Sequence, residues 1–400
     1  MYGDRVLSGM RPTGGLHIGH YHGALKNWVR LQEEHPCFFF VADWHALTTH
    51  YETPEDIEAS VWDMLVDWFA AGIDPKKATV FIQSRVPEHA ELFLLLAMAT
   101  PLGWLERVPT YKDQIERIKD RDLSTYGFLG YPLMQAADIL IYRANMVPVG
   151  EDQVPHIEMT REIARRFNHL FGTEPGFEEK AGAAVKKLGG KRGKIYLDLR
   201  NRWQEKGDRE ALEEGRALLA ASASLSMNDR ERLFGYLEGT RRVILAEPEA
   251  KLTETPKLPG LDGQKMSKST GNALLMREEP KVLTDKLRRM MTDPARVRRS
   301  DPGEPERCPV WSLHQIYSTD EVRGWAAQGC RTAGIGCLEC KQPLIEAMLR
   351  EQSVWHERAQ PYLDDPSLLR SIVADGCARA RAAAQETMRD VREAMGLAYG

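Results

Sequence analysis

Residues 5–20 read RVLSGMRPTGGLHIGH and combine an apolar stretch, a glycine-rich turn and a helix start. The apolar residues 5–10 predict a buried strand, and an amphipathic helix is predicted from about residue 18 to residue 32. The first turn of a helix offers unpaired N–H groups and a partial positive charge, so this order of elements favours phosphate binding. We expect His17 and His20 to add donors beside a polyphosphate, although two such histidines can also simply cap a helix.

The chain beyond this segment alternates strands and helices. Further strands are predicted at residues 37–42, 79–83 and 146–149, with helices at 54–71, from 87 onward, at 131–145 and up to about 168. Such alternation predicts an α/β fold with a Rossmann-type parallel sheet, whose ligands collect beyond the carboxyl ends of the strands.

Two segments depart from this alternation. Residues 173–250 are charged and helical in periodicity, and the chain from about residue 280 carries helical patterns without a further strand. We predict a catalytic domain formed by residues 1–172 and 251–279, a charged helical insertion at 173–250, and an all-α domain at 280–400.

Composition and charge exclude several classes of protein. The 400 residues are 42% apolar, enough for a sizeable core, and the chain has neither an apolar run long enough to span a membrane nor a signal-peptide pattern. A cytoplasmic protein is expected. No membrane partner is expected either. The formal net charge of −4 argues against non-specific coating of nucleic acid, so no DNA partner is expected. Two basic stretches, 186–202 and 277–299, are either solvated helix faces or contacts for one folded RNA.

A second phosphate-binding feature is the sequence KMSKS at residues 265–269. Glycines on both sides of it predict a mobile loop that carries Lys265 and Lys268. Two ammonium groups on such a loop can neutralise the charge that builds up on pyrophosphate as it leaves, which stabilises a phosphoryl-transfer transition state. A solvated lysine turn is the alternative for this segment taken alone.

Together the two motifs resemble the signatures of class I aminoacyl-tRNA synthetases. The resemblance sharpens to the tryptophanyl-tRNA synthetase family through DWHALT at 43–48, YPLMQAADIL at 131–140 and VPVGEDQ at 147–153, and it covers nearly the whole chain. It implies ATP-dependent attachment of L-tryptophan to tRNA(Trp) through a tryptophanyl adenylate, with Mg²⁺ on the ATP and a homodimeric enzyme. A tyrosyl-tRNA synthetase and a non-catalytic paralogue that binds tRNA or senses iron–sulfur status are the alternatives.

The resemblance also implies roles for individual residues. Catalysis is expected from His17, His20, Lys112, Lys265 and Lys268. Contacts to ATP are expected from Arg11, Pro12, Thr13, Gly19, His20, Gly150, Glu151, Asp152, Leu258, Lys265, Met266, Ser267, Lys268 and Ser269. The tryptophan pocket is expected to contain His45, Tyr131, Gln135, Asp138 and Gln153. Gln135 departs from the commonest bacterial form, in which a methionine often packs on the indole.

Spacing supports part of this assignment. Tyr131, Gln135 and Asp138 fall on one face of the helix predicted at 131–145. A buried Asp138 carboxylate would accept an indole N–H or, equally, a phenol O–H. Leaving such an acceptor unpaired costs about 1–3 kcal/mol, so the pocket should reject phenylalanine, while pocket shape decides between tryptophan and tyrosine. A helix-surface position for Asp138 is the alternative.

Four of the six cysteines lie close together in the sequence, namely Cys308, Cys330, Cys337 and Cys340. In a reducing cytosol such a cluster predicts metal ligands before disulfides, and spacing alone does not separate zinc from an iron–sulfur cluster. The flanking residues 293–299 and 308–311 resemble a bacterial subset of tryptophanyl enzymes that carry a [4Fe-4S] cluster in the anticodon-binding domain. A [4Fe-4S] cluster is therefore expected, with Zn²⁺ or four unligated thiols as the alternatives.

Overall fold

The computed structural model describes residues 4–108, 125–172, 176–239, 243–252, 258–268 and 270–399. Within these residues, parallel strands form one five-stranded sheet in the order β3-β2-β1-β4-β5. The strands are β1 (Val6–Met10), β2 (Cys37–Val41), β3 (Ala78–Ile82), β4 (Met146–Val149) and β5 (Glu249–Leu252). This topology confirms the predicted Rossmann-type α/β fold.

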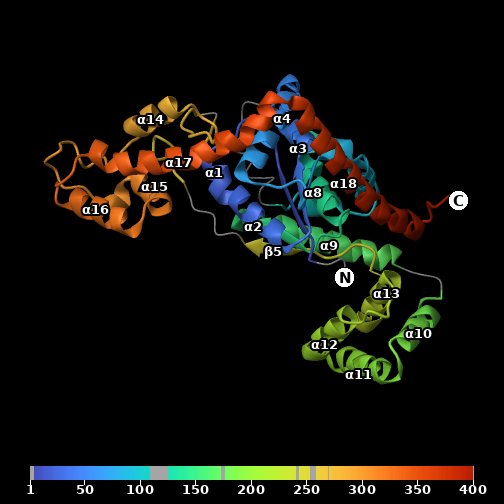
Figure 1. Cartoon of the computed structure of the whole chain (residues 1–400). Helices are drawn as coiled ribbons and strands as arrows, with labels where there is room; N and C mark the ends of the chain where they lie inside the picture. The colour runs from blue at the N-terminus through green and yellow to red at the C-terminus, as the bar shows by residue number, and fades with distance from the viewer. Residues whose placement is uncertain are drawn as a thin grey trace.

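Helices cover the sheet on both sides (Figure 1). They are α1 (Ile18–His20), η1 (Tyr21–Leu25), α2 (Lys26–Glu34), α3 (Asp43–His50), α4 (Glu55–Ala71), η2 (Gln83–Arg85), α5 (Glu88–Ala97), α6 (Leu102–Leu105), α8 (Tyr126–Leu140), η3 (Glu151–Gln153) and α9 (Val154–Phe171). The helix predicted from residue 18 to 32 therefore contains a π-helical turn, η1, between α1 and α2, and such turns are frequent at functional sites.

Strand β2 shows how the two faces of the sheet are covered. All five of its residues are buried, and its side chains alternate between the faces. Phe39 stacks on Trp28 of α2, which in turn meets Trp68 of α4 edge to face. On the opposite face Phe40 packs beside Phe81 and His89 of α5. Aromatic packing thus fixes α2 and α4 on one face and α5 on the other.

The sheet order reverses between β1 and β4, which is where doubly wound folds bind ligands. Gly9 near the end of β1 allows the ring of Phe40 to lie over the strand, because a Cβ at this position would come within 2.4 Å of that ring. Glycine at this position therefore lets Phe40 pack directly on β1, and both residues line the cavity at this end of the sheet.

Residues 176–239 form a lobe of four helices that projects from the body (Figure 1). These are α10 (Phe177–Lys187), α11 (Gly190–Lys206), α12 (Arg209–Ala220) and α13 (Met227–Glu238). They enclose an apolar cluster of their own, made of Ala184, Leu188, Tyr196, Leu212, Leu219, Leu225, Leu233 and Leu237. The helical character predicted for this segment is thus observed over most of its length.

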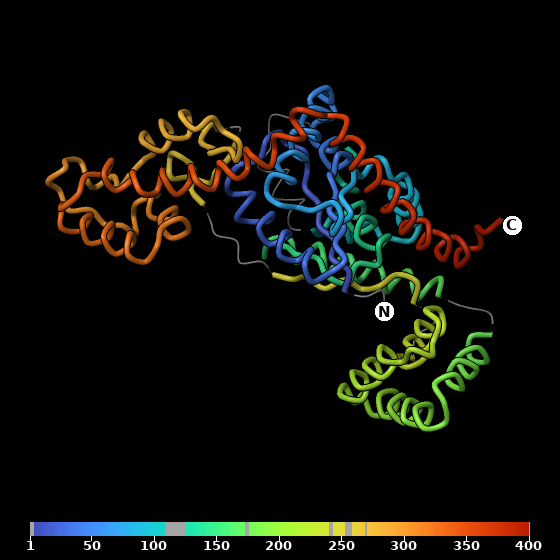
Figure 2. The backbone as a smooth tube through the Cα atoms, in the orientation of Figure 1, coloured from blue at the N-terminus to red at the C-terminus, as the bar shows by residue number. Residues whose placement is uncertain are grey.

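The C-terminal chain is helical and returns to the sheet. It contains α14 (Pro280–Arg289), η4 (Pro305–Arg307), α15 (Pro309–Tyr317), α16 (Asp320–Arg331), α17 (Cys337–Asp364) and α18 (Pro366–Ala394). Figure 2 shows α17 running from the part of the chain that contains α14, α15 and α16 back to the body, where α18 follows. A Cβ at Gly376 of α18 would lie 1.8 Å from the Val80 carbonyl oxygen of β3, so glycine is required for this backbone contact. The C-terminal helices therefore share the core of the sheet, and the domain boundaries at 172, 250 and 279 stay predictions.

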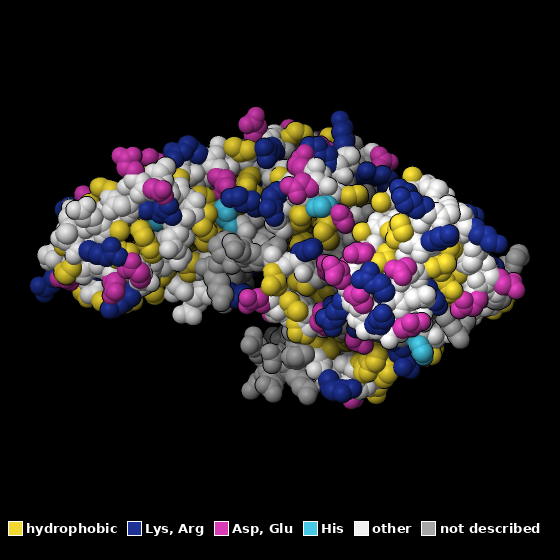
Figure 3. Space-filling model, turned by 90° about the horizontal axis from the view of Figure 1, so that it is seen from below, with side chains coloured by type: hydrophobic (Ala, Val, Ile, Leu, Met, Phe, Trp, Pro, Cys, Tyr) yellow, Lys and Arg dark blue, Asp and Glu magenta, His cyan; other side chains and the backbone are white. Residues whose placement is uncertain are grey.

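Some side chains of both basic stretches contact other parts of the chain. Arg200 lies 3.8 Å from the centre of the Tyr236 ring, and Arg202 pairs with Asp208 at 2.7 Å. Arg299 pairs with Glu339 at 3.0 Å. On the face seen from below, Lys and Arg side chains are interspersed with Asp and Glu and form no single basic surface (Figure 3). Among the described helices, none is both long and apolar enough to cross a membrane.

Three elements differ from the sequence-based expectations. Helix α3 (Asp43–His50) begins directly after β2, in a segment for which no helix was predicted. Strand β5 lies at the edge of the sheet with mostly exposed side chains, and its sequence EAKL lacks the apolar pattern of the other strands. Helix α8 begins at Tyr126, five residues before the predicted start, because Thr125 caps it by accepting the Phe128 N–H.

Candidate active site

Two cavities meet at the carboxyl ends of β1 and β4. One is an open cleft lined by His17 and His20 and by Lys265 and Lys268. The other is a cavity of about 420 Å³ between β1, α3, α8 and β4. Arg11 and Gly150 line both, so a ligand in the cleft can reach a ligand in the cavity.

Every predicted ATP contact that the structure describes lies in the cleft. These residues are Arg11, Pro12, Thr13, Gly19, His20, Gly150, Glu151, Asp152, Leu258, Lys265, Met266, Ser267 and Lys268. The predicted residues Lys112 and Ser269 lie outside the described residues. The structure therefore brings the two phosphate motifs together, although their roles stay predictions.

His17 and His20 stack on each other with ring centroids 3.7 Å apart. The backbone N–H of His17 donates to His20 Nδ1 at 3.3 Å, which leaves the proton of a neutral His20 on Nε2. Burial, the neighbouring His17 and Lys268 lower the pKa of His20 to about 3, and burial and Lys268 lower the pKa of His17 to about 4. Both histidines are therefore neutral hydrogen-bond donors at pH 7.

This neutrality predicts a pH dependence of stability. The folded pKa values lie below the ordinary histidine value of 6.5, so the unfolded chain takes up protons first as the pH falls. The stabilisation is complete above about pH 6.5 and is lost below it. Between pH 7.5 and 5.5 the wild-type free energy of unfolding should fall by roughly 1–2 kcal/mol more than that of an H17N/H20N protein, measured by urea titration. Equal losses in the two proteins would contradict the assigned protonation states.

The lysine loop is held by Asn272. The Asn272 Oδ1 accepts the Ser267 N–H at 2.7 Å, and its Nδ2 donates to Asp262 at 2.8 Å and to the Lys265 carbonyl at 3.2 Å. A Cβ at Gly260 would lie 2.5 Å from the Asn272 side chain, so the loop needs glycine there. Lys268 Nζ donates to the Thr13 carbonyl at 2.6 Å, which joins this loop to the glycine-rich turn.

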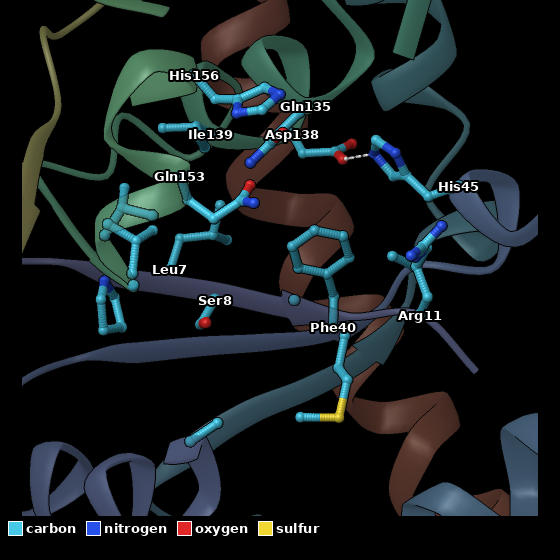
Figure 4. Close-up of a pocket in the computed structure, with 18 of the residues that line it drawn as sticks. Leu7, Ser8, Arg11, Phe40, His45, Gln135, Asp138, Ile139, Gln153 and His156 are labelled. Atoms are coloured by element: carbon cyan, nitrogen blue, oxygen red, sulfur yellow. Dashed lines mark hydrogen bonds and ion pairs between the residues drawn. The ribbon is translucent and has the colours of Figure 1, made fainter. Parts of the chain in front are cut away.

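The smaller cavity contains all five predicted tryptophan-pocket residues, His45, Tyr131, Gln135, Asp138 and Gln153. Figure 4 shows Asp138 and His45 at one end of the cavity and Gln153 nearer the other, with the Phe40 ring beside the space between them. Apolar and aromatic walls with a few polar groups suit an amino acid with a flat aromatic side chain.

Asp138 is fully buried on α8 and accepts hydrogen bonds from three side chains. His45 Nε2 donates at 2.8 Å, His89 Nδ1 at 2.6 Å, and Gln83 Nε2 at 2.8 and 3.0 Å to the two carboxylate oxygens. Burial alone would raise the pKa of Asp138, but the hydrogen bonds from His45 and His89 outweigh it and lower the pKa. The carboxylate is therefore ionised, and the helix-surface alternative for Asp138 is wrong.

A chain of hydrogen bonds continues behind Asp138. His89 Nε2 lies 2.7 Å from the Tyr142 hydroxyl, and burial, together with Asp138, raises the pKa of Tyr142 well above its ordinary value. Tyr142 therefore donates to His89, and His89 donates in turn to Asp138. Sequence reasoning missed His89 and Gln83, which reach Asp138 from α5 and η2, and Tyr142, which reaches His89 from the turn after α8.

Further polar groups line the cavity from η3, α8 and α9. Gln153 Nε2 donates to Asp152 at 2.9 Å, which leaves Gln153 Oε1 as an acceptor. The Tyr131 hydroxyl and His156 Nε2 are 3.2 Å apart. Gln135 also lines the wall. An ammonium group near Gln153 would find an acceptor there.

The four clustered cysteines come from three elements. Cys308 precedes α15, Cys330 lies near the end of α16, and Cys337 and Cys340 lie in the first turn of α17. Burial, followed by the nearness of the other three thiols, raises the pKa of Cys340 to about 12. In the described part of the chain, no three His, Cys, Asp or Glu side chains are close enough to hold a metal ion. The thiols thus lie near one another without forming a ligand arrangement, and their role as ligands stays a prediction.

Comparison with known proteins agrees with this geometry. The family described as tRNA synthetases class I (W and Y) matches residues 4–194 and 232–350, and the chain belongs to that family. The chain is 72% identical over 399 residues to the tryptophan–tRNA ligase of Ralstonia nicotianae, with 100% of both chains covered. It is 44% identical over 397 residues to that of Thermotoga maritima, covering 99% of this chain and 100% of the relative. Within the class, the chain therefore falls among the tryptophan–tRNA ligases.

A solved structure supports the same placement. Tryptophanyl-tRNA synthetase from Campylobacter jejuni, complexed with ADP and tryptophan, superposes with a TM-score of 0.73 at 28% identity. The match covers 98% of this chain and 100% of that one. The family match leaves out residues 195–231, which lie in the lobe formed by α10–α13.

Proposed function

We propose that the protein is an ATP-dependent ligase that activates L-tryptophan as an adenylate and transfers it to tRNA(Trp). The observation that carries this proposal is the junction of the two cavities at Arg11 and Gly150. The cleft that carries the two phosphate motifs opens there into a cavity whose lining suits an aromatic amino acid. A non-catalytic tRNA-binding protein has no need of both motifs in one cleft.

In the first step, a carboxylate oxygen of tryptophan attacks the α-phosphorus of ATP. The bond from this phosphorus to the bridging oxygen breaks, and pyrophosphate leaves with that electron pair. We assign Lys265 and Lys268 to neutralise the charge on the departing phosphates, and neutral His20 to donate from Nε2. Lys112 is proposed as a further phosphate contact. Mg²⁺ carried by the triphosphate would supply additional charge neutralisation.

The amino acid is held at both ends in this proposal. Asp138 accepts the indole N–H, and Gln153 Oε1 accepts from the ammonium group.

In the second step, the terminal ribose hydroxyl of tRNA attacks the carbonyl carbon of the adenylate, and AMP leaves. Charging of tRNA(Trp) and tRNA(Tyr) transcripts with each amino acid tests the function. Tryptophan on tRNA(Trp) is expected, and tyrosine on tRNA(Tyr) would move the protein to the sister family.

We further propose that the four clustered cysteines bind a [4Fe-4S] cluster. Four thiols from neighbouring elements are donors of the kind that such a cluster takes. Burial raises the pKa of Cys330, and the charge of Arg296, whose Nη1 lies 3.9 Å from the Cys330 sulfur, opposes this. When bound, the cluster would crosslink α15, α16 and α17 beside the anticodon-binding region without redox chemistry. Zn²⁺ bound by the same four cysteines is the alternative to the iron–sulfur cluster.

Colour and metal content test this site. Anaerobically purified protein is expected to be brown, with broad absorption near about 400 nm, and C340S should lose the colour. C377S is the matched control, because Cys377 lies on α18 and away from the cluster, and it should stay brown. A colourless protein with one zinc per chain would contradict the iron–sulfur proposal.

We also propose that the protein is a cytoplasmic homodimer, as the family resemblance implies. Exposed apolar side chains on or directly after the neighbouring helices α5, α6 and α8 support a contact surface there, namely Leu94, Met98, Leu102 and Tyr126. Sedimentation equilibrium should give twice the 45.3 kDa mass of one chain. An M98K protein should shift toward the monomer, and a monomeric wild type would contradict the proposal.

A further inference from the structure

Asp67 of α4 lies outside both phosphate motifs and contacts the chain beside each of them. It is 1% exposed. Its Oδ2 accepts the N–H of Leu16, the residue before His17, at 2.5 Å. Its Oδ1 accepts from Arg277 Nε, also at 2.5 Å, and Arg277 lies on the segment that leaves the lysine loop. One buried carboxylate is thus shared by two segments that are far apart in the sequence.

The backbones of these segments also pair with each other. Ile18 N–H donates to the Leu274 carbonyl at 2.9 Å, and Met276 N–H donates to the Leu16 carbonyl at 2.8 Å. Asp67 lies at the end of this short antiparallel pairing. Arg277 is held further by the carboxylate and the carbonyl of Asp63, one helical turn before Asp67 on α4. The side chain of Arg277 is 14% exposed.

The two carboxylates also act on Lys268. Burial lowers the pKa of Lys268, while Asp67 and Asp63 oppose this and favour the charged ammonium. The glycine turn passes directly between these groups, because a Cβ at Gly15 would lie 2.8 Å from Asp63 Oδ2 and a Cβ at Gly14 would lie 3.8 Å from Lys268 Nζ. A shift of Asp67 or Arg277 would therefore move both the turn and the lysine relative to the triphosphate.

We infer that Asp67 and Arg277 are positioning residues that hold the two phosphate motifs in register, so that Lys268 and His20 act on the same triphosphate. This inference rests on the proposed function. A reaction catalysed by preorganised charge is sensitive to displacements of about 1 Å, which can cost roughly 100-fold in rate. The pair contacts the cleft only through the motifs, so its loss should act on turnover and ATP use and leave tryptophan binding unchanged.

The chain offers a matched control for this pair. Arg143 and Asp390 also form a buried ion pair, with Nη2 and Oδ2 2.5 Å apart, and neither residue lines the cleft or the cavity. Arg143 also donates from Nε to the Ile244 carbonyl at 3.0 Å, so this pair joins α18 to the body. D67N and D390N therefore remove the same kind of charge from two comparably buried pairs.

The experiment compares D67N, R277K and D390N by tryptophan-dependent exchange of pyrophosphate with ATP and by thermal unfolding. D67N should lose about 10- to 100-fold in kcat, with the KM for tryptophan within about twofold of wild type. R277K keeps the positive charge but cannot donate to Asp67 and Asp63 in the geometry of the guanidinium group. Its kcat should fall by about 3- to 10-fold. D390N should lower Tm by a similar amount to D67N while keeping kcat within about threefold.

Each outcome bears on one claim. Equal kcat losses in D67N and D390N, or near-wild-type kcat in both D67N and R277K, would overturn the inference and leave the proposed function intact. If D67N does not fold, R277K against D390N decides in the same way. A wild type that exchanges with tyrosine alone would overturn the proposed substrate, and the variants would then be compared with tyrosine. A wild type without exchange would overturn both.

Discussion

Replacing Lys268 with alanine is expected to lower the kcat of tryptophan-dependent pyrophosphate exchange by about 100- to 1000-fold. The reason is the loss of one charged donor aimed at the departing phosphates, in a cleft where such groups are held in place before the reaction. The KM for tryptophan should change by less than about threefold, because Lys268 lines the cleft and not the smaller cavity. Initial-rate exchange kinetics measure both constants.

Lys281 provides the control for this variant. It is an exposed lysine in the first turn of α14 and lines neither cavity. K281A should exchange pyrophosphate at the wild-type rate. If K268A and K281A had the same kcat, Lys268 would have no part in the chemistry and the lysine loop would be only a solvated turn.

Replacing Asp138 with asparagine is expected to raise the KM for tryptophan by about 100-fold, which corresponds to roughly 2.7 kcal/mol. The asparagine amide keeps one acceptor and adds donors, although His45, His89 and Gln83 already donate to this position. The indole N–H then loses its acceptor, and buried donors are left unpaired. The KM for ATP should stay within about threefold of wild type, because Asp138 does not line the cleft.

Gln135 provides the control within the same cavity. Q135M removes a polar group from the wall without touching the Asp138 network. Its KM for tryptophan should stay within about fivefold of wild type. If D138N lost ATP binding and tryptophan binding equally, with an unchanged Tm, the assigned role of Asp138 would be wrong.

Local sequence patterns predicted much of the site. The strand, glycine turn and helix at residues 5–20 are observed as β1 and α1, and the spacing of Tyr131, Gln135 and Asp138 puts all three on the wall of one cavity. Such patterns succeed because a period of 2 or 3.6 residues is a property of one strand or one helix. The meeting of the two motifs also followed from their chemistry, since both must act on one triphosphate.

Long-range partners could not be predicted from those patterns. Asp67 and His89 have the spacing of ordinary helix residues, and only the tertiary fold brings them to Leu16, Arg277 and Asp138. Gly376 likewise gives no local signal for its contact with β3, because a glycine in a helix is usually just a weak helix former. Edge strand β5 was missed because exposed side chains remove the apolar pattern on which strand prediction depends.

The central claim is that the smaller cavity binds tryptophan and the cleft binds ATP, so that the two react to form tryptophanyl adenylate. Exchange of labelled pyrophosphate into ATP tests it directly, because the exchange needs both cavities but no tRNA. We predict exchange that depends on added tryptophan, with at least about 100-fold lower kcat/KM for tyrosine and none for phenylalanine. Exchange with tyrosine in preference to tryptophan, or no exchange with either amino acid, would contradict the account.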